Sequence, residues 1–200
     1  MRYTTPLLAL KLLVTTSCGF LRNTPPPVHE NTQTDHQQLM ATPKPTPTMT
    51  EFVFTSPEVV EARNLPVEFT CDGTSATLPL SWENAPAGTT SFAVVMHHIP
   101  GPGDSHWYWV LYNIPATVRS LIKNSQDIGM LGTNSINDRT EYSPPCSKGP
   151  GPKTYTYTIY ALSKAPEFTV PANQVNRDTL LAAIADRTLG NATLNVVYSR

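Results

Sequence analysis

Apolar and polar residues alternate in short runs through most of the chain. From Glu51 onward these runs are separated by clusters of Pro, Gly, Asn and Asp at intervals of about ten residues. This pattern is typical of short antiparallel strands joined by turns. We therefore predict a mainly β fold, an antiparallel β-sandwich with a C-terminal helix. The predicted strands are 51–55, 67–70, 80–82, 91–97, 107–113, 154–162 and 193–198.

Two neighbouring strands carry the polar groups of most interest. Segment 106–115 alternates large apolar and polar-capable side chains, which favours a half-buried strand. Before it, His97 and His98 stand between the apolar run 92–95 and a Pro/Gly loop at 100–103. Polar groups at the end of a rigid strand, beside a loop, are where ligand sites are commonly built. We expect this strand–loop–strand unit to form the floor of a pocket.

A helix is predicted near the carboxyl end. Asn176 can cap its first turn, and Asp178 lies where the helix dipole favours a negative charge. Gly190 can end it. The apolar stripe that would pack on the sandwich consists of Leu180, Leu181, Ile184 and Leu189. Segment 129–152, rich in Gly, Pro, Asn and Ser, is predicted to be a long ordered loop, either functional or a stiff connection.

The amino terminus has the features of an export signal. Arg2 supplies the positive start, an apolar core follows at 7–14, and Ser17-Cys18-Gly19 forms a small-residue exit. We interpret residues 1–18 as a signal peptide ending in a bacterial lipoprotein cleavage box, with Cys18 as the lipidated residue. Lys11 interrupts the apolar core, so simple secretion and an unprocessed start remain alternatives.

A linker is predicted between the signal and the folded part. Residues 21–50 contain no aromatic side chain and hold prolines at 25–27, 43, 45 and 47. Such a segment buries too little apolar surface to offset the entropy of ordering it. We expect a disordered Pro/Thr-rich linker at 19–50, followed by one folded domain at 51–200.

The charge balance limits the classes of binding partner, and the cysteine content indicates the redox environment. Lys plus Arg is 14 and Asp plus Glu is 15, so no net field would attract nucleic acid or an acidic membrane. Membrane association is expected only through the anchor at Cys18, and no cofactor is expected. Cys71 and Cys146 form an even pair in a chain with an export signal. They would be either a disulfide or two buried thiols, one of them lining the pocket.

Several short motifs, taken together, resemble the phosphatidylethanolamine-binding protein family, in particular its bacterial Raf kinase inhibitor-like branch. The resemblance covers about 52–198. The motifs are 69–73 (Phe-Thr-Cys-Asp-Gly), 78–82 (Leu-Pro-Leu-Ser-Trp), 86–93, His106-Trp107 with 113–115 (Asn-Ile-Pro), Tyr142 with Pro145-Cys146, and 155–162.

The resemblance implies a β-sandwich with a small anion-accepting pocket at one end. In the family, the pocket is formed by an Asp-Pro-Asp-x-Pro loop, the histidine of the His-Trp strand and a loop ending in His-Arg-Tyr. Here His106 and Tyr155 match, Pro100 closes the first loop, and Lys153 stands in place of the second-loop histidine. The residues implied to bind ligand are Met96, His98, Pro100, His106, Tyr142, Pro145, Cys146, Lys153 and Tyr155.

The departures from the family pattern change the charge of the pocket. Met96 and His98 stand where the two aspartates would be, which removes negative charge. An ammonium at Lys153 adds positive charge. We therefore expect a small anion or phosphorylated ligand rather than the ammonium of an ethanolamine, in an exported binding protein that could also modulate an unidentified partner protein.

Three alternatives stay open. The protein could be a non-binding structural or inhibitor-like envelope protein. It could bind a metal through His98 or His97 with His106 and the nearby Asp104, although adjacent histidines point to opposite faces and leave few ligands. It could also be a hydrolase with Ser105 or Cys146 as nucleophile and His106 as base, although no nucleophile-elbow motif is present.

Overall fold

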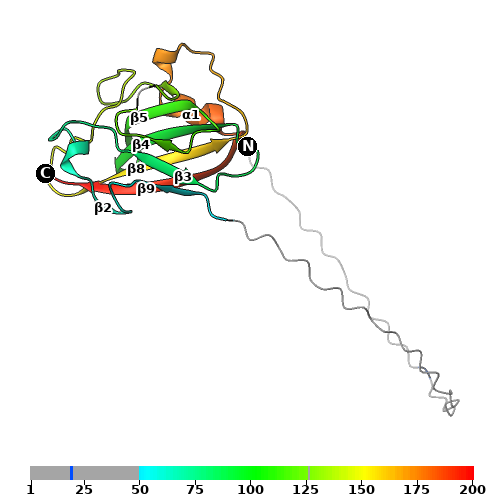
Figure 1. Cartoon of the computed structure of the whole chain (residues 1–200), viewed down its shortest axis with the longest axis horizontal. Coiled ribbons are helices and arrows are strands. Elements are labelled where there is room, and N and C mark those ends of the chain that lie inside the picture. The colour runs from blue at the N-terminus through cyan, green and yellow to red at the C-terminus, as the bar shows by residue number, and fades with distance from the viewer. Residues whose placement is uncertain (1–18, 20–49, 126) are drawn as a thin grey trace, which may run out of the picture. The chain divides into compact units, whose positions relative to one another are not determined.

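The computed structural model describes residues 19, 50–125 and 127–200. The predicted signal peptide and almost all of the predicted linker lie outside these residues. Within them, no helix has the length and apolar character needed to cross a membrane. Figure 1 shows a fold dominated by strands, with a short α-helix beside the larger sheet. The predicted mainly β fold is confirmed.

Two sheets form the domain. The smaller one has the strand order β1-β3-β6, with bounds Val53–Thr55, Leu80–Glu83 and Ser120–Leu121. The larger one has the order β2-β9-β8-β4-β5-β7. Its strands are β2 (Arg63–Asn64), β4 (Ser91–Gly101), β5 (Asp104–Pro115), β7 (Met130–Leu131), β8 (Lys153–Leu162) and β9 (Thr188–Tyr198). All neighbours are antiparallel except β2, which runs parallel to β9.

The main core combines side chains from both sheets. Trp82 of β3 and Phe92 of β4 are buried, and their rings lie edge to face at 5.3 Å. The opposite face of the larger sheet forms a second core, in which Val95 and Tyr112 belong to the same buried cluster as side chains of the helix. Successive residues of a strand point to opposite faces. The long strands β4, β5 and β8 therefore supply both cores and are buried on both sides.

The helix, α1 (Arg177–Ile184), begins where the sequence predicts. Asn176 Oδ1 accepts a hydrogen bond of 2.9 Å from Thr179 N, and Asp178 occupies the first turn. Leu180 and Ile184 are buried in the second core. The predicted extension to Gly190 is wrong. Leu189 and Gly190 belong to β9, because pairing with β8 supplies the backbone hydrogen bonds of this segment.

One predicted strand is instead a 3-10 helix, η1 (Val67–Phe69). Pro66 fixes the backbone before it, and Thr70 closes the turn by donating from both N and Oγ1 to the Val67 carbonyl. Gly73 packs against the same turn, where an added Cβ would lie 2.1 Å from Val67 O. The Cys-Asp-Gly motif thus needs glycine for a close backbone approach.

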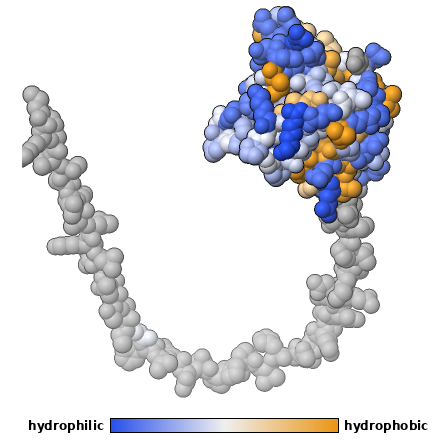
Figure 2. Space-filling model, turned by 90° about the vertical axis from the view of Figure 1, so that its left-hand side faces the viewer, coloured by the Kyte–Doolittle hydropathy of each residue, from blue (hydrophilic) through white to orange (hydrophobic). Residues whose placement is uncertain are grey.

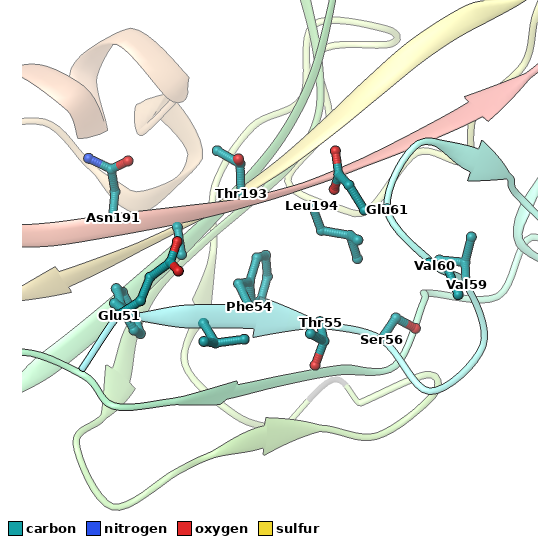
Figure 3. Close-up of a pocket in the computed structure, with 13 residues that line it drawn as sticks. Glu51, Phe54, Thr55, Ser56, Val59, Val60, Glu61, Asn191, Thr193 and Leu194 are labelled. Atoms are coloured by element: carbon teal, nitrogen blue, oxygen red, sulfur yellow. The ribbon is translucent and has the colours of Figure 1, made fainter.

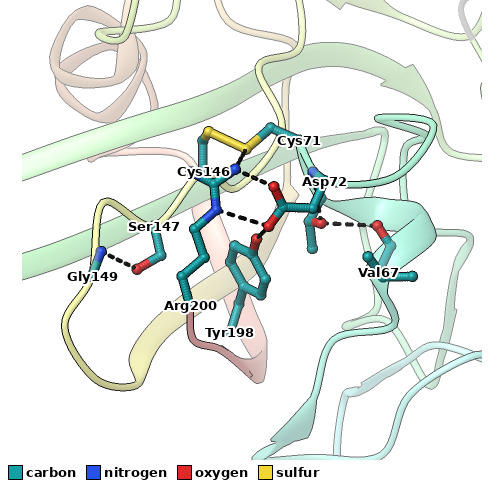
Figure 4. Close-up of polar contacts among 9 residues, drawn as sticks. Val67, Cys71, Asp72, Cys146, Ser147, Gly149, Tyr198 and Arg200 are labelled. Carbon is teal, nitrogen blue, oxygen red and sulfur yellow. Dashed lines mark hydrogen bonds and ion pairs between the residues drawn. A yellow bond between two sulfur atoms is a disulfide. The ribbon is translucent and has the colours of Figure 1, made fainter.

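The carboxyl terminus is joined to the turn after η1 (Figure 4). Tyr198 Oη and Arg200 both donate hydrogen bonds to the Asp72 carboxylate, with Arg200 Nε at 2.8 Å from Oδ2. Beside them Cys71 and Cys146 form a disulfide. Cys71 N also donates to Pro145 O at 3.0 Å. Of the two alternatives that the sequence leaves open for these cysteines, the structure has the disulfide.

The disulfide should contribute strongly to stability. It closes a chain segment with a sequence separation of 75, for which loop-closure entropy corresponds to about 4 kcal/mol. We expect the double substitution C71S/C146S to lower the free energy of unfolding by up to about 4 kcal/mol. Urea denaturation of oxidised wild type and variant measures this difference. Equal transition midpoints would contradict it.

Asp72 should make the stability depend on pH in acid. Hydrogen bonds from Arg200 and Tyr198 lower its pKa from 3.8 to about 2. Because the folded pKa is depressed, this stabilisation is present above pH 3.8 and is lost as the pH falls towards 2. We expect D72N to be less stable than wild type at neutral pH, with the difference disappearing near pH 2. Unfolding measured against pH tests this, with the exposed D127N as control.

Candidate functional site

The hairpin of β4 and β5 places two histidines side by side. In its register His98 lies directly opposite His106, and His97 lies opposite Trp107. His98 and His106 therefore share one face of the sheet, whereas His97 points to the other. The predicted loop at 100–103 is shorter than expected, because Gly101 still pairs with Asp104. Gly103 makes the turn possible with a φ of +82°.

A cavity of about 420 Å³ opens at this end of the sheet. Its walls come from the end of β4, the start of β5, the irregular segment between β7 and β8, and the first residue of β8. The lining residues are His98, Pro100, His106, Tyr108, Ser135, Ile136, Cys146, Lys148 and Lys153.

His98 is the most firmly held polar group of the cavity. Its ring is buried, and Nδ1 donates a hydrogen bond of 2.8 Å to the Thr154 carbonyl. This bond leaves Nε2 as the nitrogen available to a ligand. The ring lies 5.3 Å from that of Tyr155, which in turn meets Tyr108 edge to face at 5.2 Å. Burial raises the pKa of both tyrosines, so they remain neutral.

Two lysines give the cavity its positive character, and His106 adds an imidazole. His106 Nε2 lies 3.6 Å from Asp104 Oδ2, and the His106 side chain is 44% exposed. Lys148 and Lys153 also line the cavity, whereas Asp104 does not. An ammonium is a compact charge with donor hydrogens only, so it suits phosphate or carboxylate oxygens. The arrangement can hold a small anion chemically.

The structure brings together His98, Pro100, His106, Cys146 and Lys153 from the predicted set. The other predicted residues do not line the cavity. Met96 is on the same face as His98 but is fully buried in the main core. Tyr155 is fully buried against the His98 ring.

The remaining two predicted residues support neighbouring structure. Tyr142 packs edge to face on Trp109 at 5.6 Å, and its hydroxyl donates to the Phe69 carbonyl at 3.5 Å. Pro145 is buried and accepts the hydrogen bond from Cys71 N. Packing against the core and the disulfide therefore keeps both side chains away from the cavity.

Four lining residues are absent from the predicted set. Tyr108 follows His106 by two positions on β5, so the period of a strand could have indicated it. Lys148 lies in a Gly/Pro-rich segment, and no regular pattern of apolar and polar residues predicts where that segment lies in the fold. Ser135 and Ile136 come from a turn far along the chain, and Ser135 Oγ accepts a hydrogen bond from Trp107 N at 2.9 Å.

A second cavity, of about 640 Å³, lies between β1 and β9 (Figure 3). Its charged lining residues are Glu51 and Glu61, and Glu61 accepts hydrogen bonds of 2.8 Å from Asn195. Carboxylates repel anions, so this cavity does not match the predicted ligand. The described residues contain no group of three His, Cys, Asp or Glu side chains that could hold a metal ion.

The molecular surface is mixed in character. On the face shown in Figure 2, hydrophobic residues gather in separate groups among hydrophilic ones. Exposed apolar side chains include Val60 at 71% and Ile99 at 58%. Ile99 follows His98 on β4, close to the cavity in sequence.

Comparison with solved structures supports the assignment of the fold. The crystal structure of E. coli YbcL, described as a member of the mammalian PEBP family, superposes with a TM-score of 0.68 at 25% identity and covers 76% of this chain and 99% of YbcL. The structure of a PEBP homologue, CT736 of Chlamydia trachomatis, gives a TM-score of 0.67 at 23% identity over 74% of this chain and 97% of CT736.

Sequence relatives extend the comparison. A UPF0098 protein of Methanothermobacter thermautotrophicus is 29% identical over 140 residues, which cover 68% of this chain and 91% of that protein. LppC of Mycobacterium tuberculosis, which is named as a lipoprotein, is 28% identical over 177 residues, covering 88% of this chain and 83% of LppC. The family model for phosphatidylethanolamine-binding protein matches residues 55–199. The chain therefore belongs to the phosphatidylethanolamine-binding protein family.

Proposed function

We propose that this protein is an exported binding protein for a small anionic or phosphorylated ligand, held in the cavity at the end of the β4–β5 hairpin. One observation carries the proposal: His98, His106, Lys148 and Lys153 converge on one cavity, and the described residues that line it include no carboxylate. Donors without opposing acids attract an anion and disfavour a cation.

The choice of ligand follows from the same balance of charge. Lys153, at the start of β8, and Lys148, in the preceding loop, can neutralise a phosphate or carboxylate. His98 Nε2 can accept a hydrogen bond from a protonated phosphate oxygen, because Nδ1 carries the proton donated to the Thr154 carbonyl. The ammonium of a phosphoethanolamine group would meet these same positive groups. A simple phosphate should therefore bind at least as well as phosphoethanolamine.

Export is the second part of the proposal. The apolar segment at 7–14 followed by Ser17-Cys18-Gly19 supports a lipoprotein signal. LppC aligns over 88% of this chain and is named as a lipoprotein. We propose that residues 1–18 direct export, that Cys18 becomes the lipidated amino terminus, and that residues 19–50 tether the domain to the membrane.

Removing a lysine ammonium should weaken anion binding. We expect K153A to raise the Kd for inorganic phosphate about tenfold, because a hydrogen bond to a charged group contributes about 1.5–3 kcal/mol. Isothermal titration calorimetry measures this, with thermal unfolding to verify the fold. K164A is the matched control, since Lys164 pairs with Glu167 away from the cavity. Equal phosphate affinity of K153A and wild type would contradict the proposal.

Cys18 should decide membrane attachment. When the full chain is expressed in a bacterial host, we expect wild type in the membrane fraction with a mature mass that includes a diacylglyceryl group at Cys18. C18S should lose this modification because the thiol is the lipid acceptor. Mass spectrometry of the amino-terminal peptide tests this, and an intact, unmodified residue 1 in wild type would contradict it.

A further inference from the structure

The disulfide lies at the edge of the proposed anion cavity rather than deep in a core. Cys146 is exposed and lines the cavity, whereas Cys71 is only half-buried and sits in the turn after η1. A disulfide sulfur must be reachable before a thiolate can attack it. The exposure of Cys146 meets this condition from the cavity side.

The cavity would favour one class of incoming thiol. Lys148 stands two residues after Cys146, and both Lys148 and Lys153 line the same cavity as Cys146. Positive charges around a concave site raise the local concentration of anions and the rate of their association. A thiol compound carrying carboxylates would therefore be concentrated beside Cys146 Sγ, unlike a neutral or cationic thiol.

The two sulfurs differ in their surroundings (Figure 4). Arg200 Nη2 donates one hydrogen bond to Cys71 Sγ, at 3.2 Å, and another to Asp72 Oδ1. The Asp72 carboxylate also accepts hydrogen bonds from Tyr198 Oη and Arg200 Nε, so its charge is compensated. A neighbouring guanidinium stabilises a thiolate, and a stabilised thiolate leaves faster. Cys71 is therefore the better leaving group.

We propose that the Cys71–Cys146 disulfide is a thiol-exchange site for anionic low-molecular-weight thiols, with Cys146 as the attacked sulfur. The incoming thiol first loses its proton to solvent. Its thiolate sulfur then forms a bond to Cys146 Sγ, the Cys71–Cys146 bond breaks, and the electron pair leaves with Cys71 Sγ as a thiolate beside Arg200. One disulfide replaces another, so no separate oxidant or reductant is needed.

Exchange would also loosen the cavity wall. The disulfide joins the turn after η1 to the irregular segment that carries Lys148. After exchange, the two segments would still be joined by the backbone hydrogen bond from Cys71 N to Pro145 O. The exchange of bonds at the disulfide does not require the proposed function. The preference for anionic thiols and the coupling to anion binding both rest on the same positively charged cavity.

The test uses the oxidised mature chain and three probe thiols. We expect glutathione, which is anionic, to form a mixed disulfide faster than neutral 2-mercaptoethanol, and cationic cysteamine to be slowest at equal thiolate concentration. Alkylation of the released thiol followed by peptide mass spectrometry should place the probe on Cys146 and the alkyl group on Cys71.

Three variants separate the effect of anion steering from the effect of the leaving group. K148A/K153A should lower the glutathione rate about tenfold and leave the 2-mercaptoethanol rate nearly unchanged, because only the steering of an anion is lost. R200Q should slow all three thiols severalfold, and R200K should restore part of the rate, because the leaving thiolate needs a cation. K164A and R139Q, at exposed positions outside the cavity, are controls.

Particular results would overturn the proposal. These are a probe attached to Cys71 rather than Cys146, equal rates for the three thiols, or a rate unaffected by R200Q in a variant that remains folded. Phosphate calorimetry on the oxidised protein keeps the two proposals distinct. If phosphate binds but no thiol exchange occurs, only the proposal of an exchange site is refuted. If exchange occurs at Cys146 but phosphate does not bind, only the proposed function is refuted.

Discussion

The pairing of β4 with β5 and β8 is the constraint on which the rest of the structure depends. β4 lies between these two strands, and its residues 92–96 are buried on both faces. Backbone groups so far from water must find hydrogen-bond partners, which fixes the register of the three strands. The same register sets His98 opposite His106 at the end of the hairpin, so the site is positioned by the sheet.

The irregular segment between β7 and β8 needs other restraints, because regular backbone pairing does not hold it. The disulfide ties Cys146 to the turn after η1, and the Asp72 ion pair ties that turn to Arg200 at the carboxyl end. These contacts stabilise the loop that carries Lys148 into the cavity wall. The disulfide and the ion pair therefore shape this part of the cavity wall, and Cys146 of the disulfide itself lines the cavity.

The chain belongs to the phosphatidylethanolamine-binding protein family. The cavity at the end of its β4–β5 hairpin is lined by His98, His106 and Lys153 among other residues. His98 satisfies its buried Nδ1 through the Thr154 carbonyl, so the imidazole fits the site without an acidic partner.

The sequence by itself determined the mainly β class, the long strands, the helix start at Asn176 and the even cysteine pair, because these follow from local periodicity, capping chemistry and composition. Only the tertiary structure decided the turn at 67–69, the end of the helix, and which predicted residues reach the cavity. Met96 and His98 share one strand face, yet packing buries the first in the core and leaves the second at the cavity. Lys148 and Ser135 enter through long-range contacts that no local pattern encodes, since their positions depend on where distant segments meet.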